Sequence, residues 1–149
     1  MLLAGAKVPD VVASDDGGAP VRLRDLGKKA LVVYFYPRAD TPGCTSETIQ
    51  FRDLNGSFDK KGVRVVGVSR DSVAAQAKFK AKYAGPFALL ADVESAICDA
   101  FGVIVEKNMY GKKSLGIQRS TFLIRDGVVT KVWPKVKVEG HAAEVLSSL

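Results

Sequence analysis

Cys44 lies in a short stretch of polar and turn-forming residues, TPGCTSE, whereas most free cysteines lie inside apolar segments. Thr41 followed by Pro42 predicts the start of a helix, with the threonine as N-cap and the proline at the first helical position. Cys44 then lies in the first turn, where free backbone N–H groups and the helix dipole stabilise an anion. A thiol in this position loses its proton more easily, and the thiolate is its nucleophilic form.

The same turn brings other polar side chains to the cysteine. Helical spacing puts Thr41, Cys44 and either Glu47 or Thr48 on one side of the helix. The sequence therefore favours nucleophilic chemistry at Cys44. The alternative is that Thr41 only caps the helix and that the cysteine is incidental.

Other uses of cysteine fit the sequence less well. A dithiol–disulfide exchange enzyme with a C-x-x-C motif needs a second cysteine close by, and the chain has only Cys44 and Cys98. A metal site would have to recruit both cysteines and His141, the only histidine, but their scattered positions match no zinc-ligand spacing. We therefore expect no metal, and His141 is predicted to be a surface residue at the start of the last helix.

Apolar runs alternate with segments of helical spacing along the chain. The continuous apolar runs at residues 30–36 and 63–68 are typical of strands buried on both faces. Asp126 and Gly127 separate two strand-like segments and predict a hairpin with a type I′ turn. The other predicted elements are a helix containing Phe51, Leu54 and Phe58, helices over 72–83, 95–101 and 142–149, a strand over 87–90, and the hairpin strands 119–125 and 128–133.

This order of elements predicts the fold class. Strands that alternate with helices and end in a hairpin indicate a three-layer α/β domain with a mixed sheet. In such folds ligands bind beyond the carboxyl ends of the central strands, and Cys44 follows the end of the strand at residues 30–36. A length of 149 residues fits a single domain over residues 1–149.

Composition limits the classes of partner. The chain is 47% hydrophobic and 26% charged, as is typical of a soluble globular protein. Its formal charge of +6 comes from scattered lysines without interleaved aromatic residues, so nucleic-acid binding is not expected. No segment has the length and apolarity of a membrane span, and the first ten residues, MLLAGAKVPD, lack the apolar core of a signal peptide. Two cysteines are too few for a secreted disulfide framework, which favours a cytoplasmic protein.

Pro37, Thr41 and Cys44 form the pattern P-x-x-x-T-x-x-C within YPRADTPGCTSE. This pattern resembles the active-site motif of peroxiredoxins, and the chain is most similar to their bacterioferritin comigratory protein, or peroxiredoxin Q, subfamily. The likeness covers nearly the whole chain, through KVPDV, VVGVSRDS, FALLADVESAICDAFGV, GIQRSTFLI and the closing helix, in the expected order. The resemblance implies a thioredoxin-like fold and reduction of hydrogen peroxide and organic hydroperoxides by a cysteine thiolate, without metal, haem or flavin.

The resemblance also implies a role for each matching residue. Cys44 is the peroxidatic nucleophile, and Thr41 offers its hydroxyl to the peroxide and the thiolate. Pro37 shields the pocket from bulk water. Arg119, in GIQRSTF, is the guanidinium beside the cysteine, and Glu47 is the carboxylate that orients it. Without the resemblance, Arg119 at the start of an apolar strand is typical of a surface side chain that keeps its charged end in water.

The sequence departs from the family pattern at the resolving cysteine. Many members carry it five residues after the nucleophile, where this chain has Ile49, and others carry it in the helix matching residues 72–83, which has no cysteine here. Cys98 is the only candidate left for a resolving cysteine. Its spacing from Ile97 and Phe101 is typical of the core side of a helix, so packing is its favoured role.

We therefore expect a one-cysteine peroxidase that acts as a monomer. Cys44 is oxidised to a sulfenic acid, and an external thiol such as thioredoxin, glutaredoxin or glutathione reduces it. Two alternatives stay open. One is a two-cysteine enzyme that uses Cys98, and the other is a redox-sensing or holdase-like interaction module on the same fold.

Overall fold

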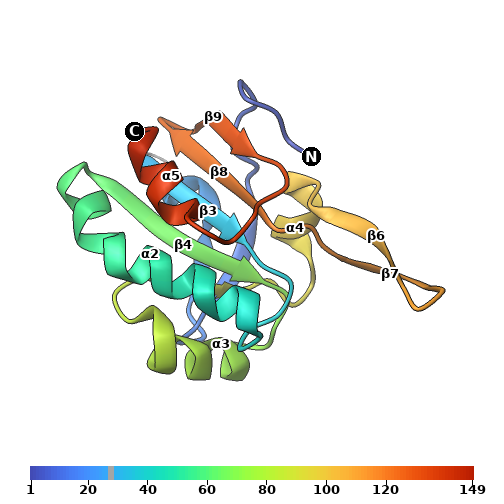
Figure 1. The fold of residues 1–149 in the computed structure, drawn as a ribbon. Helices are drawn as coiled ribbons and strands as arrows, with labels where there is room; N and C mark the ends of the chain where they lie inside the picture. The colour runs from blue at the N-terminus through green and yellow to red at the C-terminus, as the bar shows by residue number, and fades with distance from the viewer. Residues whose placement is uncertain (27–28) are drawn as a thin grey trace.

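The computed structural model describes residues 1–26 and 29–149, and within these residues seven strands form one mixed sheet (Figure 1). In their order across the sheet they are β2 (Pro20–Arg22), β1 (Val12–Asp15), β5 (Leu89–Ala91), β4 (Val63–Ser69), β3 (Ala30–Phe35), β8 (Ser120–Arg125) and β9 (Val128–Trp133). The central strands β3, β4 and β5 are parallel, and the outer strands pair antiparallel.

Helices cover both faces of this sheet (Figure 1). On one face lie α2 (Pro42–Lys60), α3 (Val73–Phe79), the π-helical turn η1 (Lys80–Ala84) and α5 (His141–Ser147); on the other lie α1 (Leu23–Leu26) and α4 (Ala96–Phe101). This is the three-layer α/β/α arrangement that the sequence predicts. Among residues 1–26 and 29–149, none of the helices combines the length and the apolar composition of a membrane span.

Strand β3 divides the apolar core between the two faces. Successive side chains of a strand point to opposite faces of its sheet. Leu31, Val33 and Phe35 accordingly pack in the cluster beneath α4, while Val32 and Tyr34 pack in the cluster beneath α2. All five are fully buried, which explains why this strand is apolar without interruption.

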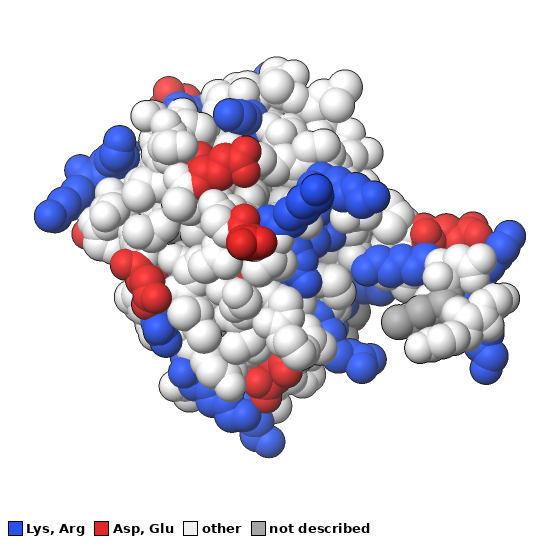
Figure 2. All heavy atoms as spheres, viewed as in Figure 1, with Lys and Arg blue, Asp and Glu red and all other residues white. Residues whose placement is uncertain are grey.

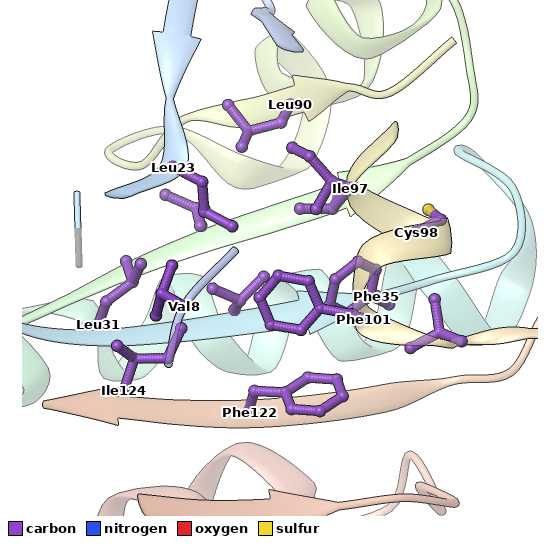
Figure 3. Packing of buried hydrophobic residues seen from close by; sticks show 14 of the residues in the cluster. Val8, Leu23, Leu31, Phe35, Leu90, Ile97, Cys98, Phe101, Phe122 and Ile124 are labelled. Atoms are coloured by element: carbon purple, nitrogen blue, oxygen red, sulfur yellow. The ribbon is translucent and has the colours of Figure 1, made fainter. Parts of the chain in front are cut away.

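Each cysteine belongs to a different one of these clusters. Cys44 lies with Tyr34 and Phe51 in the cluster on the α2 face. Cys98 lies with Phe35 and Phe101 in the cluster on the α4 face, and Figure 3 shows it on α4 among these side chains. The central sheet therefore separates the two thiols.

The elements predicted from local patterns are largely confirmed. The strands at residues 30–36 and 63–68 correspond to β3 and β4. The β8–β9 turn has positive φ at both central residues, 51° at Asp126 and 77° at Gly127, as a type I′ turn requires. The helix predicted over residues 72–83 is confirmed, with α3 continuing from Lys80 as the π-helical turn η1.

Two antiparallel features were not predicted. β1 and β2 extend the sheet at one edge. β6 (Ile104–Met109) and β7 (Lys112–Ile117) form a separate two-stranded hairpin that projects from the body (Figure 1). The last residue of this hairpin, Ile117, stands only three residues before Ser120, where β8 begins, so the base of the hairpin lies next to the central sheet.

Candidate active site

Cys44 lies where the chain turns from β3 into α2. β3 ends at Phe35, and α2 begins at Pro42, so Cys44 occupies the first turn of a 19-residue helix beyond the carboxyl end of a central parallel strand. The side chain of Cys44 is fully buried. The N–H groups of a first helical turn have no acceptor within the helix, which leaves donors beside this sulfur.

Thr41 stands at the N-cap position as predicted, but its hydroxyl does not cap the helix. Its backbone is extended (φ −87°, ψ 156°), and its carbonyl accepts the first helical hydrogen bond, from the N–H of Thr45 at 2.8 Å. The hydroxyl instead donates to the carbonyl of Arg38 at 2.8 Å. This contact closes the turn between β3 and α2.

Arg119 contacts both Cys44 and Glu47 through its guanidinium group. Its Nη2 donates to Sγ of Cys44 at 3.3 Å, and its Nη1 donates to Oε1 of Glu47 at 2.8 Å. The side chain of Glu47 is fully buried, and that of Arg119 is only 16% exposed. The surface position that is typical of an arginine at the start of an apolar strand, considered without the family resemblance, is therefore not the one that Arg119 occupies.

Strand pairing explains how Arg119 reaches a cysteine so distant in the sequence. β8 runs antiparallel to β3, with Ser120 opposite Phe35. Arg119 therefore lies beside the end of β3, where the chain turns toward Cys44. Gly43 leaves the space for its guanidinium, because a Cβ at this position would lie 3.1 Å from Nη2 of Arg119.

Burial and neighbouring charges shift the pKa values of Glu47 and Arg119. Loss of solvent raises the pKa of Glu47 to about 7, although the charge and hydrogen bond of Arg119 act in the opposite direction. The second carboxyl oxygen of Glu47, Oε2, is buried and has no hydrogen-bond partner among the described residues. Burial lowers the pKa of Arg119, but attraction to Glu47 and Cys44 outweighs it and the net shift is upward. Arg119 therefore stays charged.

Aromatic side chains from β3 and α2 form the apolar base of the site. The rings of Tyr34 and Phe51 stack with their centroids 4.6 Å apart. The hydroxyl of Tyr34 shares a hydrogen bond of 2.9 Å with Oγ1 of Thr48. Burial raises the pKa of Tyr34 well above its usual range, so this hydroxyl stays neutral. Of the other predicted site residues, Pro37 is exposed in the turn between β3 and α2.

Comparison with known proteins identifies the family. Residues 4–132 match the model of the AhpC/TSA family. The chain belongs to this family. It is 50% identical to a putative peroxiredoxin of Coxiella burnetii over 97% of both chains, and 46% identical to peroxiredoxin Bcp of Bacillus subtilis over 97% of this chain and 93% of that protein.

Solved structures agree with this assignment. The bacterioferritin comigratory protein of Xanthomonas campestris matches with a TM-score of 0.90 and 47% identity, covering 97% of this chain and 96% of that chain. A peroxidoxin of Mycobacterium tuberculosis matches with a TM-score of 0.85 and 35% identity, over 97% of this chain and 94% of that chain. The chain is thus a peroxiredoxin of the bacterioferritin comigratory protein group and a thiol-dependent peroxidase with a thioredoxin-like fold.

His141 of this peroxiredoxin is buried, and its prediction as a surface residue is wrong. It begins α5 as expected, but it is only 2% exposed. Its Nε2 shares a hydrogen bond of 2.7 Å with Oγ1 of Thr121, and the rings of Phe51 and Trp133 pack edge-on against it. Burial lowers its pKa to about 4, so the imidazole is neutral. No group of three or more potential metal-ligating side chains occurs among the described residues.

Cys98 is in a different environment from Cys44. Its backbone N–H donates to Oδ2 of Asp92 at 2.7 Å, and its side chain is fully buried. Burial, together with the nearby Asp92 carboxylate, raises the pKa of the Cys98 thiol. This thiol is therefore held in its neutral, less nucleophilic form.

Lys107 is a basic residue near the site that the sequence did not indicate. It lies on β6, and its side chain passes over Gly116 of β7. A Cβ added to Gly116 would lie 3.2 Å from Cδ of Lys107. Burial lowers its pKa, Arg119 lowers it further, and the charge of Cys44 raises it, so its ammonium group lies within electrostatic range of both. Figure 2 shows Lys and Arg side chains gathered where the hairpin leaves the body. The sequence of this hairpin has no apolar periodicity that would have located it.

Proposed function

We propose that this peroxiredoxin reduces hydrogen peroxide and organic hydroperoxides at Cys44 in a one-cysteine cycle. The observation that carries the proposal is the position of the Arg119 guanidinium, 3.3 Å from Sγ of Cys44 at the first turn of α2. This cation does not lose its proton, and together with the helix N–H groups it favours a thiolate. The same donors stabilise the charge that develops on the leaving oxygen.

The cycle begins with attack of the Cys44 thiolate on the terminal oxygen of a hydroperoxide. An S–O bond forms, the O–O bond breaks, and the leaving alkoxide or hydroxide takes up a proton to become alcohol or water. The sulfur is now a sulfenic acid, the first step of cysteine oxidation. One thiol of the reductant condenses with it, releasing water, and a second thiol reduces the resulting mixed disulfide and restores Cys44.

Other residues support this chemistry in the proposal. Thr41 offers its hydroxyl to the bound peroxide, after release from the Arg38 carbonyl that it contacts in the resting protein. Pro37, exposed in the turn that precedes α2, covers the peroxide and excludes bulk water. Glu47 orients the guanidinium of Arg119 through the 2.8 Å hydrogen bond between them.

The position of Cys98 supports resolution by an external thiol. A disulfide requires Cα atoms within about 7 Å of each other, whereas Cys44 and Cys98 pack on opposite faces of the central sheet. Ile49, where many relatives carry the resolving cysteine, has no thiol. Thioredoxin, glutaredoxin and glutathione are the candidate reductants.

We also propose that the protein acts as a cytoplasmic monomer. Cys44, Glu47 and Arg119 come from a single chain, so the proposed site needs no residue from a second copy. The two cysteines are unpaired, which suits a reducing compartment.

Replacement of each cysteine tests the proposal. Cys44→Ser should abolish thiol-dependent peroxide consumption, because a serine hydroxyl does not ionise at neutral pH. Cys98→Ser is the matched control and should keep nearly the turnover of the unmodified protein. Turnover should be measured with hydrogen peroxide and with an organic hydroperoxide, after thermal unfolding has shown that both variants fold. Substantial turnover in Cys44→Ser would refute the role of Cys44, and loss of turnover in Cys98→Ser would refute the one-cysteine cycle.

A further inference from the structure

Two acidic groups in the site contact the same cation. Arg119 donates one N–H to Sγ of Cys44 and another to Oε1 of Glu47. Cys44 and Glu47 are both fully buried. If both were ionised, the buried site would contain two negative charges against one guanidinium, and two like charges that share a site disfavour each other's ionisation.

The surrounding groups do not add a second cation in contact with Glu47. Tyr34 on β3 is neutral, since burial raises its pKa well above the usual range. His141 on α5 is also neutral, with a pKa lowered to about 4 by burial. Lys107 on β6 lies within electrostatic range of Cys44 and Arg119. Among the described residues Arg119 is thus the one cation in hydrogen-bond contact with Glu47.

The hydrogen bonding of Glu47 fits a carboxyl group that is protonated part of the time. Its Oε2 is buried without a partner among the described residues. An ionised carboxylate with a bare buried oxygen is costly, and a neutral carboxylic acid is much less so. The pKa of about 7, raised by burial, agrees with this geometry.

We infer that Cys44 and Glu47 share one negative charge opposite Arg119, and that the charge moves from the sulfur to the carboxyl group when Cys44 is oxidised. The inference rests on the proposed function. In the reduced protein Cys44 is the thiolate and Glu47 is the protonated acid. Attack on the hydroperoxide turns Cys44 into a neutral sulfenic acid, and the guanidinium is left without an anion. Glu47 then ionises and restores the ion pair.

This step needs no net proton from the solvent, because the proton released by Glu47 equals the one taken up by the leaving group. The S–O bond forms as the O–O bond breaks, and the leaving alkoxide needs one proton to become an alcohol. Glu47 releases one proton in the same step, so net uptake from solvent is zero. Glu47 acts through Arg119 and is a positioning residue that keeps the charge of the site constant through the oxidation.

Infrared difference spectroscopy tests this inference directly. Reduced protein, held below the Glu47 pKa of about 7, is compared with protein oxidised by one equivalent of hydroperoxide. We expect the carbonyl band of a protonated carboxylic acid to disappear on oxidation. The band should be absent from the difference spectrum of Glu47→Gln and unchanged in Glu94→Gln, an exposed carboxyl control. A difference spectrum of the unmodified protein without such a band would overturn the inference.

Proton counting with a pH indicator gives a second readout. During a single oxidation the unmodified protein should take up almost no protons, whereas Glu47→Gln should take up about one per chain. Equal uptake of about one proton by both proteins would also overturn the inference. Mass spectrometry of the same samples separates the two proposals. Oxidised Cys44 without the carboxyl signal contradicts only the charge transfer, and a Cys44 that is not oxidised refutes the proposed function and the inference with it.

Discussion

Arg119 makes two charge-assisted hydrogen bonds with one planar group, to the sulfur of Cys44 and to the carboxyl of Glu47. Such bonds are stronger than those between neutral groups, and a rigid guanidinium orients both at once. A lysine supplies the same charge but not this geometry. Both the charge of Arg119 and the orientation of its guanidinium should therefore determine how fast Cys44 reacts with a hydroperoxide.

Replacement of Arg119 separates charge from geometry. Arg119→Ala should slow oxidation of Cys44 by a hydroperoxide roughly 10²–10³-fold, the usual effect of losing one donor to a developing anion. Arg119→Lys should give an intermediate rate. Single-turnover oxidation at neutral pH measures both, with thermal unfolding as a check that each variant folds. An alanine variant that reacts as fast as the unmodified protein would show that Arg119 has no part in the attack.

The first turn of α2 could be predicted from the sequence because its signals are local. Thr41 and Pro42 mark the helix start, and Cys44 follows at a fixed position in the turn. Arg119 could not be located in this way, because its contact with Cys44, 75 residues away, depends on the pairing of β8 with β3. Only the family resemblance suggested it. The β6–β7 hairpin was missed for a related reason: of its described residues only Ile104 and Ile117, at its base, pack in or against the core, and its strands carry no apolar alternation.

Replacement of Gly43, the residue before Cys44, tests whether the space that it leaves on α2 sets the position of the Arg119 guanidinium. A Cβ at Gly43 would lie 3.1 Å from Nη2 of Arg119, so Gly43→Ala should displace the guanidinium and slow oxidation of Cys44. Gly56 lies in the same helix, and a Cβ there would have nothing within 4 Å, which makes Gly56 the matched control. Gly56→Ala should keep the rate and stabilise the fold by about 0.5–1 kcal/mol. Equal oxidation rates in the two variants would mean that Gly43 does not set the position of Arg119.

Tertiary packing determines the state of groups whose local sequence carries no signal. His141 is buried because β8 supplies Thr121 as its hydrogen-bond partner and because Phe51 and Trp133 pack against its ring. These residues come from three different elements, so its burial could not be read from residues near it in the sequence. Glu47 is buried in the same layer of the protein, and burial shifts the pKa values of the two groups in opposite directions.

These two shifts predict opposite effects of pH on stability. The pKa of His141 falls from 6.5 to about 4 on folding, so the unfolded chain binds more protons in this range and the contribution of His141 is lost as pH falls. The pKa of Glu47 rises from 4.5 to about 7, so its contribution is lost as pH rises through that range.

Urea unfolding measured from about pH 4 to about pH 7 separates the contributions of His141 and Glu47 to the free energy of unfolding. His141→Gln should be less stable than the unmodified protein at neutral pH, and the difference should shrink by on the order of 2 kcal/mol toward the lower pKa. For Glu47→Gln the trend is opposite: the stability of the unmodified protein relative to this variant should fall as pH rises. Parallel pH profiles for all three proteins would contradict both shifts.

The mass of the intact protein after one equivalent of hydroperoxide, without added thiol, tests the one-cysteine cycle most directly. We predict a gain of one oxygen atom at Cys44, which a sulfenic-acid reagent traps and an added thiol reverses. The same product should form in Cys98→Ser, because Cys98 lies on the other face of the sheet. Loss of two hydrogen atoms instead, with a peptide that links Cys44 to Cys98, would show that the chain rearranges during turnover and that the protein resolves its own sulfenic acid.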